Sequence, residues 1–188
     1  STLARTLFPY TTLFRSNVSI RDHQLRLLRK VIPIGVALSA EKDYNRLLET
    51  LVVEAQFFTN ADAGTLYILE DNALKFVILR NTSLDMAMGG TSGAEIPFYP
   101  VKLYKPDGSE NRANVVSHAA LTHKRINIAD AYEADGFDFS GTKAFDARTK
   151  YRSKSFLAIP LENTDNKVIG VLQLINAKNA DTGEIIPF

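Results

Sequence analysis

The 188-residue sequence contains no cysteine and no tryptophan, and it has only three histidines. Without cysteine there can be no disulfide, no thiolate metal site, no thiol nucleophile and no thioether-linked chromophore. The same absence fits an intracellular compartment, so we expect a cytoplasmic protein. None of His23, His118 and His123 is followed directly by aspartate, which argues against the His-Asp metal cluster of HD-type hydrolases.

Long hydrophobic runs and an excess of charge are also missing. No apolar run approaches the roughly 20 residues that a membrane-spanning helix needs. The formal net charge is +1 and the 22 lysines and arginines are scattered along the chain. Neither a nucleic-acid partner nor a membrane-surface contact is therefore predicted. With 45% hydrophobic residues, the chain has the composition of one soluble globular domain with a sizeable core.

Signatures of catalysis are equally absent. The run GGTSG at residues 89–93 lacks the adjacent acidic pair of a cyclase signature, and no Gly-Lys-Ser/Thr of a phosphate-binding Walker loop follows it. His118 and His123 are five residues apart, a spacing that does not place them on one helix face. The sequence thus predicts no catalytic residue and no metal ligand, and we expect a binding or regulatory protein rather than an enzyme.

Residues 1–16 differ in character from the rest of the chain. Thr6–Ser16, TLFPYTTLFRS, resembles one frame of a sequencing-adapter oligonucleotide, so we interpret residues 1–16 as a non-native segment. The alternatives are an apolar extension or a weak signal peptide with Arg5 as its basic region. Pro9 interrupts the apolar run and no small-residue cleavage site follows, which argues against a signal peptide. On this interpretation the chain derives from a longer parent protein.

Two helices are expected next. Residues 17–36 are predicted to form a linker helix with apolar side chains on one face, which Pro33 and Gly35 would end. The strongest helical periodicity in the chain follows in residues 39–58, where apolar side chains recur at three- and four-residue spacing. Ser39 is the expected N-cap of this second helix.

Strand patterns dominate the remainder. Residues 60–64, NADAG, have turn chemistry that would close the preceding helix. Strands are expected at residues 65–69, 74–79, 101–104, 125–128, 155–161 and 168–176. A short helix is expected at residues 114–122 and a long glycine-rich loop or lid at residues 81–100. Pro160 predicts an edge position or a bulge within its strand. This order predicts an α+β fold with a central antiparallel sheet and helices packed on one face.

Residues 127–176 contain the most distinctive pattern. A loop rich in Asp, Phe, Gly and Ser ends in DARTKYRSK, and the strand-like runs SFLAIPL and VIGVLQLIN follow, joined by ENTDNK. This order resembles the second half of a GAF domain of the cyclic-nucleotide phosphodiesterase and adenylate cyclase type, found in bacterial multidomain signalling proteins. The resemblance covers residues 37–188. It implies a GAF (PAS-like) fold whose C-terminal helix is truncated here.

The resemblance also implies a ligand site. In family members that bind cyclic nucleotides, a loop of this type covers the purine and ribose, and the N-terminal amides of a short helix meet the phosphate. The matching positions are Val115, Val116, Asp146, Thr149, Ser153 and Gln173. Each has a plainer alternative: Asp146 can brace its own loop, Thr149 and Ser153 can be surface hydroxyls, and Gln173 faces either a pocket or solvent.

A second family motif is only partly present. The family has Asn-Lys, then Phe, then Asp-Glu, and this motif pins the ligand-enclosing structure together. Asn176 matches the first position, but Ala177 stands where lysine is expected and Lys178 follows one residue late. Phe188 matches the phenylalanine, and the sequence stops before the Asp-Glu. This departure from the motif weakens the case for a cyclic nucleotide as the ligand, but it does not weaken the case for the GAF fold.

The expected function is that of a regulatory, small-molecule-sensing module. Its ligand would be cyclic AMP, cyclic GMP or a similar compound, and the module would act as a homodimer on a covalently linked output domain: a cyclase, an HD-type phosphodiesterase or a kinase. The alternative is a ligand-free dimerisation module that uses the helices around Leu25 and Leu47. Gln173 and Asp146 pointing into a polar cavity would favour sensing, whereas a cavity filled by phenylalanine would favour dimerisation.

Overall fold

The computed structural model describes residues 31–33, 35–36 and 39–188. The segment 1–16 and most of the predicted linker helix lie outside the described residues. Pro33 and Gly35, which were expected to end that helix, are themselves helical, as proline can kink a helix without ending it. The chain divides into two compact units, residues 1–42 and 43–188, and the second unit is described here by itself.

Helix α2 (Tyr44–Thr59) begins later than the sequence pattern predicted. Asp43 is its N-cap, and the Asp43 carboxylate accepts a hydrogen bond from the Arg46 amide over 3.0 Å. Ser39, the predicted cap, instead donates its hydroxyl hydrogen to a backbone carbonyl four residues earlier. Asn60 ends the helix in the left-handed conformation, with φ of 54°. The prediction of Ser39 was wrong because Asp43, directly before the first apolar residue of the repeat, Tyr44, caps equally well.

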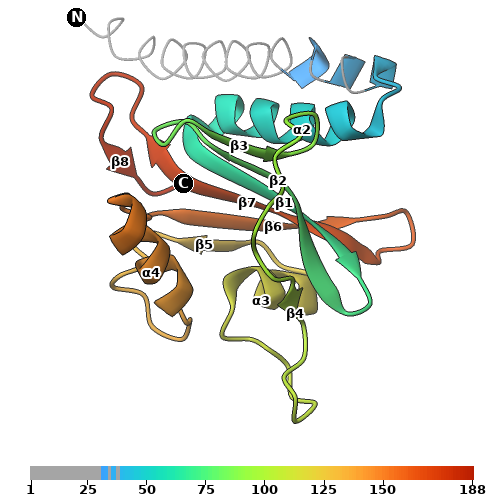
Figure 1. Cartoon of the computed structure of the whole chain (residues 1–188), viewed down its shortest axis with the longest axis vertical. Coiled ribbons are helices and arrows are strands. Elements are labelled where there is room, and N and C mark those ends of the chain that lie inside the picture. Colours follow the sequence, from blue (N-terminus) through green and yellow to red (C-terminus); the bar gives the residue numbers. More distant parts are fainter. Residues whose placement is uncertain (1–30, 34, 37–38) are drawn as a thin grey trace, which may run out of the picture. The chain divides into compact units, whose positions relative to one another are not determined.

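Eight strands form one antiparallel sheet (Figure 1). They are β1 (Ala61–Glu70), β2 (Ala73–Asn81), β3 (Met86–Gly89), β4 (Val101–Lys102), β5 (Ile126–Ile128), β6 (Phe156–Glu162), β7 (Val168–Lys178) and β8 (Ile185–Ile186). The main order is β3-β2-β1-β7-β6-β5, while β4 pairs with β2 and β8 pairs with β7. Asp71 and Asn72 connect β1 to β2 with positive φ at both residues, the usual geometry of a two-residue hairpin turn.

Strand β1 starts at Ala61, inside the segment that was predicted to be a turn. Ala61 pairs with Ala177 of β7. Gly64 lies directly under α2, where a Cβ atom would come within 2.8 Å of Cγ1 of Val52. Gly64, one of the residues that suggested a turn, therefore serves a different purpose: it lets the helix approach the strand closely.

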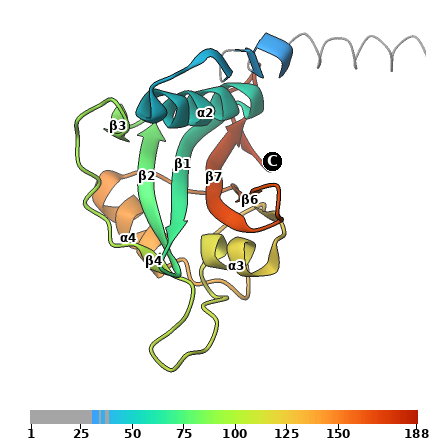
Figure 2. The same ribbon diagram turned by 90° about the vertical axis from the view of Figure 1, so that its right-hand side faces the viewer.

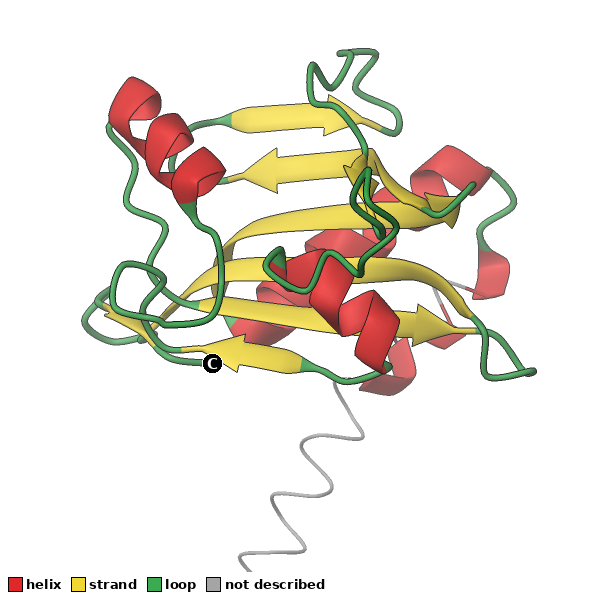
Figure 3. Ribbon diagram, turned by 90° about the horizontal axis from the view of Figure 1, so that it is seen from below, coloured by secondary structure: helices red, strands yellow, loops and turns green. Residues whose placement is uncertain are grey.

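Helices cover both faces of the sheet, not one face as expected (Figures 1 and 2). Leu66 of β1 packs with α2 on one face, whereas Tyr67 belongs to the core on the other face. That second face is covered by α3 (Val115–Thr122) and α4 (Ser140–Thr149); in Figure 3, α3 lies in front of the strands and α4 lies at the upper left, beside the strand ends. Most of β1 is buried on both sides, and a strand of that kind requires cover on both faces.

Two elements lie where the sequence predicted only loop. Helix α4 has no side-chain cap at Phe139 and few buried residues, so its sequence gives little helical signal. Strand β3 lies in the predicted lid and pairs with β2, with Gly89 opposite Ile78. The rest of the predicted lid, residues 90–100, contains no helix or strand; we call it the strap.

The remaining strand and helix expectations are confirmed, including the one at Pro160. Strand β5 pairs only with residues 156–158 of β6, so Pro160 lies beyond it at a local edge. The register between β6 and β7 also shifts at Leu161/Glu162. Within the part of the chain that the structure describes, no helix has both the length and the apolar composition of a membrane span.

Candidate functional site

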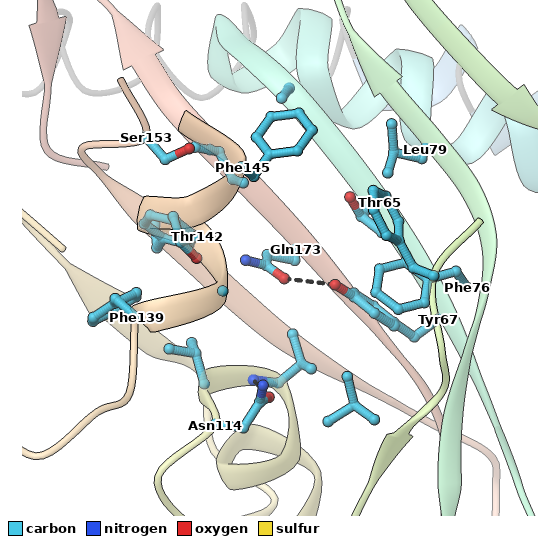
Figure 4. A pocket seen from close by; sticks show the side chains of 18 of the residues that line it. Thr65, Tyr67, Phe76, Leu79, Asn114, Phe139, Thr142, Phe145, Ser153 and Gln173 are labelled. Atoms are coloured by element: carbon cyan, nitrogen blue, oxygen red, sulfur yellow. Dashed lines mark hydrogen bonds between the residues drawn. The ribbon is translucent and has the colours of Figure 1, made fainter. Parts of the chain in front are cut away.

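A cavity of about 390 Å³ lies between the sheet, α3, α4 and the strap (Figure 4). Phe98 and Tyr99, from the loop that was predicted as a lid at residues 81–100, line the cavity. Aromatic rings form a large part of its wall. They come from Tyr67, Phe76, Phe98, Tyr99, Phe139, Phe145, Tyr151 and Phe156. Aromatic walls of this kind suit the faces of a flat ring system.

Gln173 lies on the floor of the cavity and is 8% exposed. Its neighbours Leu172 and Leu174 face α2, so the alternation of β7 turns Gln173 to the pocket side. The hydroxyl of Tyr67 donates to Oε1 of Gln173 over 3.0 Å. Burial raises the pKa of Tyr67, which keeps the hydroxyl protonated and able to donate.

The Tyr67 hydrogen bond decides which end of the Gln173 carboxamide faces the cavity. Because Oε1 accepts from Tyr67, the nitrogen Nε2 points away from the ring and toward Thr142 of α4 (Figure 4). Nε2 has no hydrogen-bond partner among the described residues. The cavity floor therefore presents one N–H donor to whatever enters.

The N-terminus of α3 forms a second side of the cavity. Asn114, Val115 and Val116 line it, and both valines are buried. Asn114 is the N-cap: its Oδ1 accepts from the amides of Val116 (3.1 Å) and Ser117 (3.2 Å). The Val116 amide, one of the two that were expected to meet a phosphate, is thus held by a neutral carboxamide in this structure.

Charged groups are sparse along the described lining. Arg80 reaches the cavity wall, but its guanidinium pairs with Glu49 of α2 over 2.5 Å. Asp138 accepts from the amide of Ser140 over 2.8 Å at the start of α4. An anionic ligand would accordingly depend on backbone donors rather than on an unpaired lysine or arginine of this wall.

Two of the six predicted ligand residues do not line the cavity. Asp146 is 3% exposed, and its carboxylate accepts from the Ser153 amide and hydroxyl, both over 2.8 Å, and from the Tyr132 hydroxyl over 2.9 Å. Thr149 donates its hydroxyl hydrogen to the carbonyl of Phe145 over 2.9 Å. Asp146 braces its loop, the plainer of its two alternatives. Val115, Val116, Ser153 and Gln173 do line the cavity.

The mouth of the cavity is formed by aromatic rings from opposite sides. Phe98 of the strap lies 6.4 Å from Phe145 of α4 and 5.5 Å from Phe76, measured between ring centroids. Phe76 in turn contacts Tyr67 on the floor at 4.6 Å. Sequence analysis missed Tyr67, Phe76 and Phe98; the alternation of β1 and β2 could have indicated the first two.

Asn176 fixes the segment that follows α4. The residue is fully buried with φ of 59°, and its Nδ2 donates to the Arg152 carbonyl over 2.7 Å. Its Oδ1 accepts from the amides of Lys154 (2.7 Å) and Ser155 (3.3 Å). The pinning role that the resemblance implied for this asparagine is therefore visible in the contacts. Within residues 31–33, 35–36 and 39–188, no cluster of three or more His, Asp or Glu side chains could hold a metal ion.

The family model of the GAF domain matches residues 43–186, which is most of the second unit and most of the chain. The chain belongs to the GAF family. GAF domains are regulatory sensor modules of signalling proteins and are typically non-catalytic. The α+β fold predicted from sequence is confirmed as a GAF fold.

Similar curated proteins include cGMP-specific 3',5'-cyclic phosphodiesterases of Drosophila melanogaster and Drosophila sechellia. Each is 27% identical over 146 residues, covering 74% of this chain. This GAF chain spans only 12% and 11% of their respective lengths.

Similar solved structures include GAF domains of phosphoenolpyruvate-protein phosphotransferases. The one from Coxiella burnetii has a TM-score of 0.59 at 16% identity, covering 81% of this chain and 79% of its own. The one from Acinetobacter has a TM-score of 0.56 at 15% identity, covering 82% and 78%. At this level of identity the likeness concerns the GAF fold alone.

Proposed function

We propose that this GAF domain senses a cyclic nucleotide, with cyclic GMP as the first candidate, and regulates a covalently linked output domain. The observation that carries the proposal is the free Nε2 donor of Gln173 on the floor of an aromatic cavity. Support also comes from the Drosophila relatives, whose names specify cyclic GMP. The output domain would be a cyclase, an HD-type phosphodiesterase or a kinase.

The purine is assigned to the aromatic part of the cavity. Its faces pack between the rings of Phe76, Phe98 and Phe145, where apolar burial and ring contacts favour it. Nε2 of Gln173 then requires an acceptor on the purine edge, and O6 of guanine or N1 of adenine supplies one. A cavity of about 390 Å³ falls within the range of small-molecule sites.

The cyclic phosphate is assigned to the N-terminus of α3. Helix N-termini attract anions through unpaired amides and the positive end of the helix dipole. In this site the Asn114 carboxamide occupies those amides, so the phosphate must displace it from the Val116 and Ser117 N–H groups. Asn114 thereby becomes a residue through which the phosphate assignment can be tested.

The experiment is calorimetric titration of cyclic GMP and cyclic AMP into the protein at about 100 μM, near the limit for weak binding. Asn114→Asp retains a capping oxygen but places a negative charge where the phosphate would lie, whereas Asn114→Ser retains a neutral cap. We expect Asn114→Asp to weaken binding at least about 10-fold, equivalent to about 1.4 kcal/mol, and Asn114→Ser to change it far less. Wild-type protein that binds neither nucleotide would refute the assignment.

A ligand-free dimerisation module is the second candidate. Its supporting observation is the outward side of α2, where Phe57 is 79% exposed and Val53 is 38% exposed. Large exposed apolar side chains are typical of association surfaces. The residues chosen earlier to separate the two functions give a divided result, because Gln173 faces the cavity and Asp146 does not. Sedimentation of wild type and Phe57→Ser, with and without cyclic GMP, would separate dimerisation from ligand sensing.

A further inference from the structure

Asp62, near the start of β1, is a buried carboxylate held by three side-chain donors. Its side chain is 2% exposed. Lys178 Nζ donates to Oδ1 over 2.5 Å, and Ser83 Oγ donates to the same oxygen over 2.8 Å. The hydroxyl of Tyr151 donates to Oδ2 over 2.6 Å. We call Asp62 and these three donors the Asp62 junction.

The junction adjoins the cavity on one side and α2 on the other. Tyr151 connects the junction to the cavity, because it donates to Asp62 and also lines the cavity wall. The backbone carbonyl of Asp62 accepts from Nε2 of Gln56, a buried side chain of α2, over 3.0 Å. Asn60, which ends α2, makes two hydrogen bonds with Lys178. Its side-chain Nδ2 donates to the Lys178 carbonyl over 2.5 Å, and its backbone carbonyl accepts from the Lys178 amide over 2.9 Å.

We propose that the Asp62 junction transmits occupancy of the cavity to the C-terminal half of α2. This inference rests on the proposed function, because it requires a ligand in the cavity. A ligand that packs against Tyr151 restricts the position of its phenol. The phenol and Asp62 move together, because separating them would leave a buried carboxylate one donor short. Asp62 is bonded to Gln56, so the restriction reaches α2 through contiguous hydrogen bonds.

Hydrogen exchange in the ligand-free protein tests the junction itself. Tyr151→Phe removes one hydroxyl and keeps the ring on the cavity wall. Tyr132→Phe is the matched control, because the Tyr132 hydroxyl also donates to a buried carboxylate, that of Asp146, but makes no hydrogen bond to α2 among the described residues. We expect amides of residues 52–59 to exchange about 3- to 10-fold faster in Tyr151→Phe than in wild type. Equal acceleration in both variants would mean a general loss of stability and would overturn the proposal.

The second arm adds cyclic GMP at a concentration that saturates the wild type in calorimetry. We expect the nucleotide to slow exchange in residues 52–59 of wild type and Tyr132→Phe. Tyr151→Phe should bind it within about 3-fold of wild type yet show no such slowing. If Tyr151→Phe binds and slows α2 as wild type does, the junction does not transmit occupancy. If wild type binds no cyclic nucleotide, the proposed function fails, and the ligand-free comparison still decides whether Tyr151 and α2 are coupled.

Discussion

Asp146 is the residue beside the cavity with the clearest structural role. Its carboxylate satisfies two donors of Ser153 and one of Tyr132 in a buried setting. Asp146→Ala leaves those donors without an acceptor, so we expect the free energy of unfolding to fall by about 2–3 kcal/mol. Asp146→Asn keeps the volume and one acceptor oxygen and should lose less. Urea denaturation at pH 7 measures both; a loss below about 0.5 kcal/mol for the alanine variant would contradict the bracing role.

The lowered pKa of Asp62 predicts how the stability of the domain depends on pH. Burial raises the pKa of its carboxyl, but hydrogen bonds from Lys178, Tyr151 and Ser83 outweigh burial, and the net pKa lies below the ordinary value. A carboxyl with a lowered folded pKa stabilises the fold above its unfolded pKa of about 3.9, and this contribution is lost as the pH falls through the folded pKa.

The corresponding test compares Asp62→Asn with wild type. At pH 6 we expect the variant to be less stable by about 1.5–3 kcal/mol, because it loses charge-assisted hydrogen bonds. As the pH falls below the unfolded pKa of about 3.9 and through the lower folded pKa, the two proteins should converge because Asp62 itself becomes protonated. Urea denaturation across this pH range measures the gap. A gap that stays constant with pH would show that the ionised form of Asp62 is not what the fold stabilises.

Single residues differ in how well their surroundings could be predicted. Gln173 was predictable to one face because leucines flank it on a strand. Its bond with Tyr67 was not, because Tyr67 lies 106 residues earlier in the chain. Asp146 and Thr149 lie on α4, and the direction of their side chains depends on tertiary packing of a helix with little amphipathic pattern of its own.

At the scale of elements, the contact between α2 and β1 depends on one missing side chain. A Cβ atom on Gly64 would lie 2.8 Å from Cγ1 of Val52 and 3.1 Å from Cγ of Gln56. Gly64→Ala should therefore destabilise the domain by about 1–3 kcal/mol through overpacking. The double variant Gly64→Ala/Val52→Ala makes room for the new methyl group, so the two effects should be non-additive by at least about 0.5 kcal/mol in thermal unfolding. Strict additivity would show that the two side chains do not meet.

Elements with a periodic pattern were predicted closely, and those without one were missed. Helix α3 begins at Val115, one residue after the expected start at Asn114, and β7 runs two residues past the predicted end. Strand β3 was not predicted, because Met86–Gly89 forms a strand only by pairing with β2. The opposite error at residues 61–64 arose because Asp62 and Gly64 favour turns locally, while tertiary contacts favour a strand there.

At the scale of the whole molecule, one face of the sheet forms a packed core and the other face forms part of the cavity wall. The face under α2 is a packed core that includes Leu66, Leu172 and Leu174. The opposite face supplies Tyr67 and Gln173 to the cavity and is covered by α3 and α4. The sequence indicated the antiparallel sheet but placed all helices on one side, because local periodicity does not tell which face of a strand a helix will cover.

The strand order has a consequence for synthesis of the chain. Strand β1 pairs with β7, and their partnered residues are more than 100 positions apart, as at Ile68 and Gly170. A ribosome adding about 5–20 residues per second therefore needs on the order of 5–20 s after β1 emerges before β7 can pair with it. During that interval the β1–β2 hairpin has an open edge, and the face opposite α2 stays uncovered until α3 and α4 have been synthesised. The nascent domain is thus exposed to association for seconds, and its folding rate is limited by the non-local pairing of its central strands.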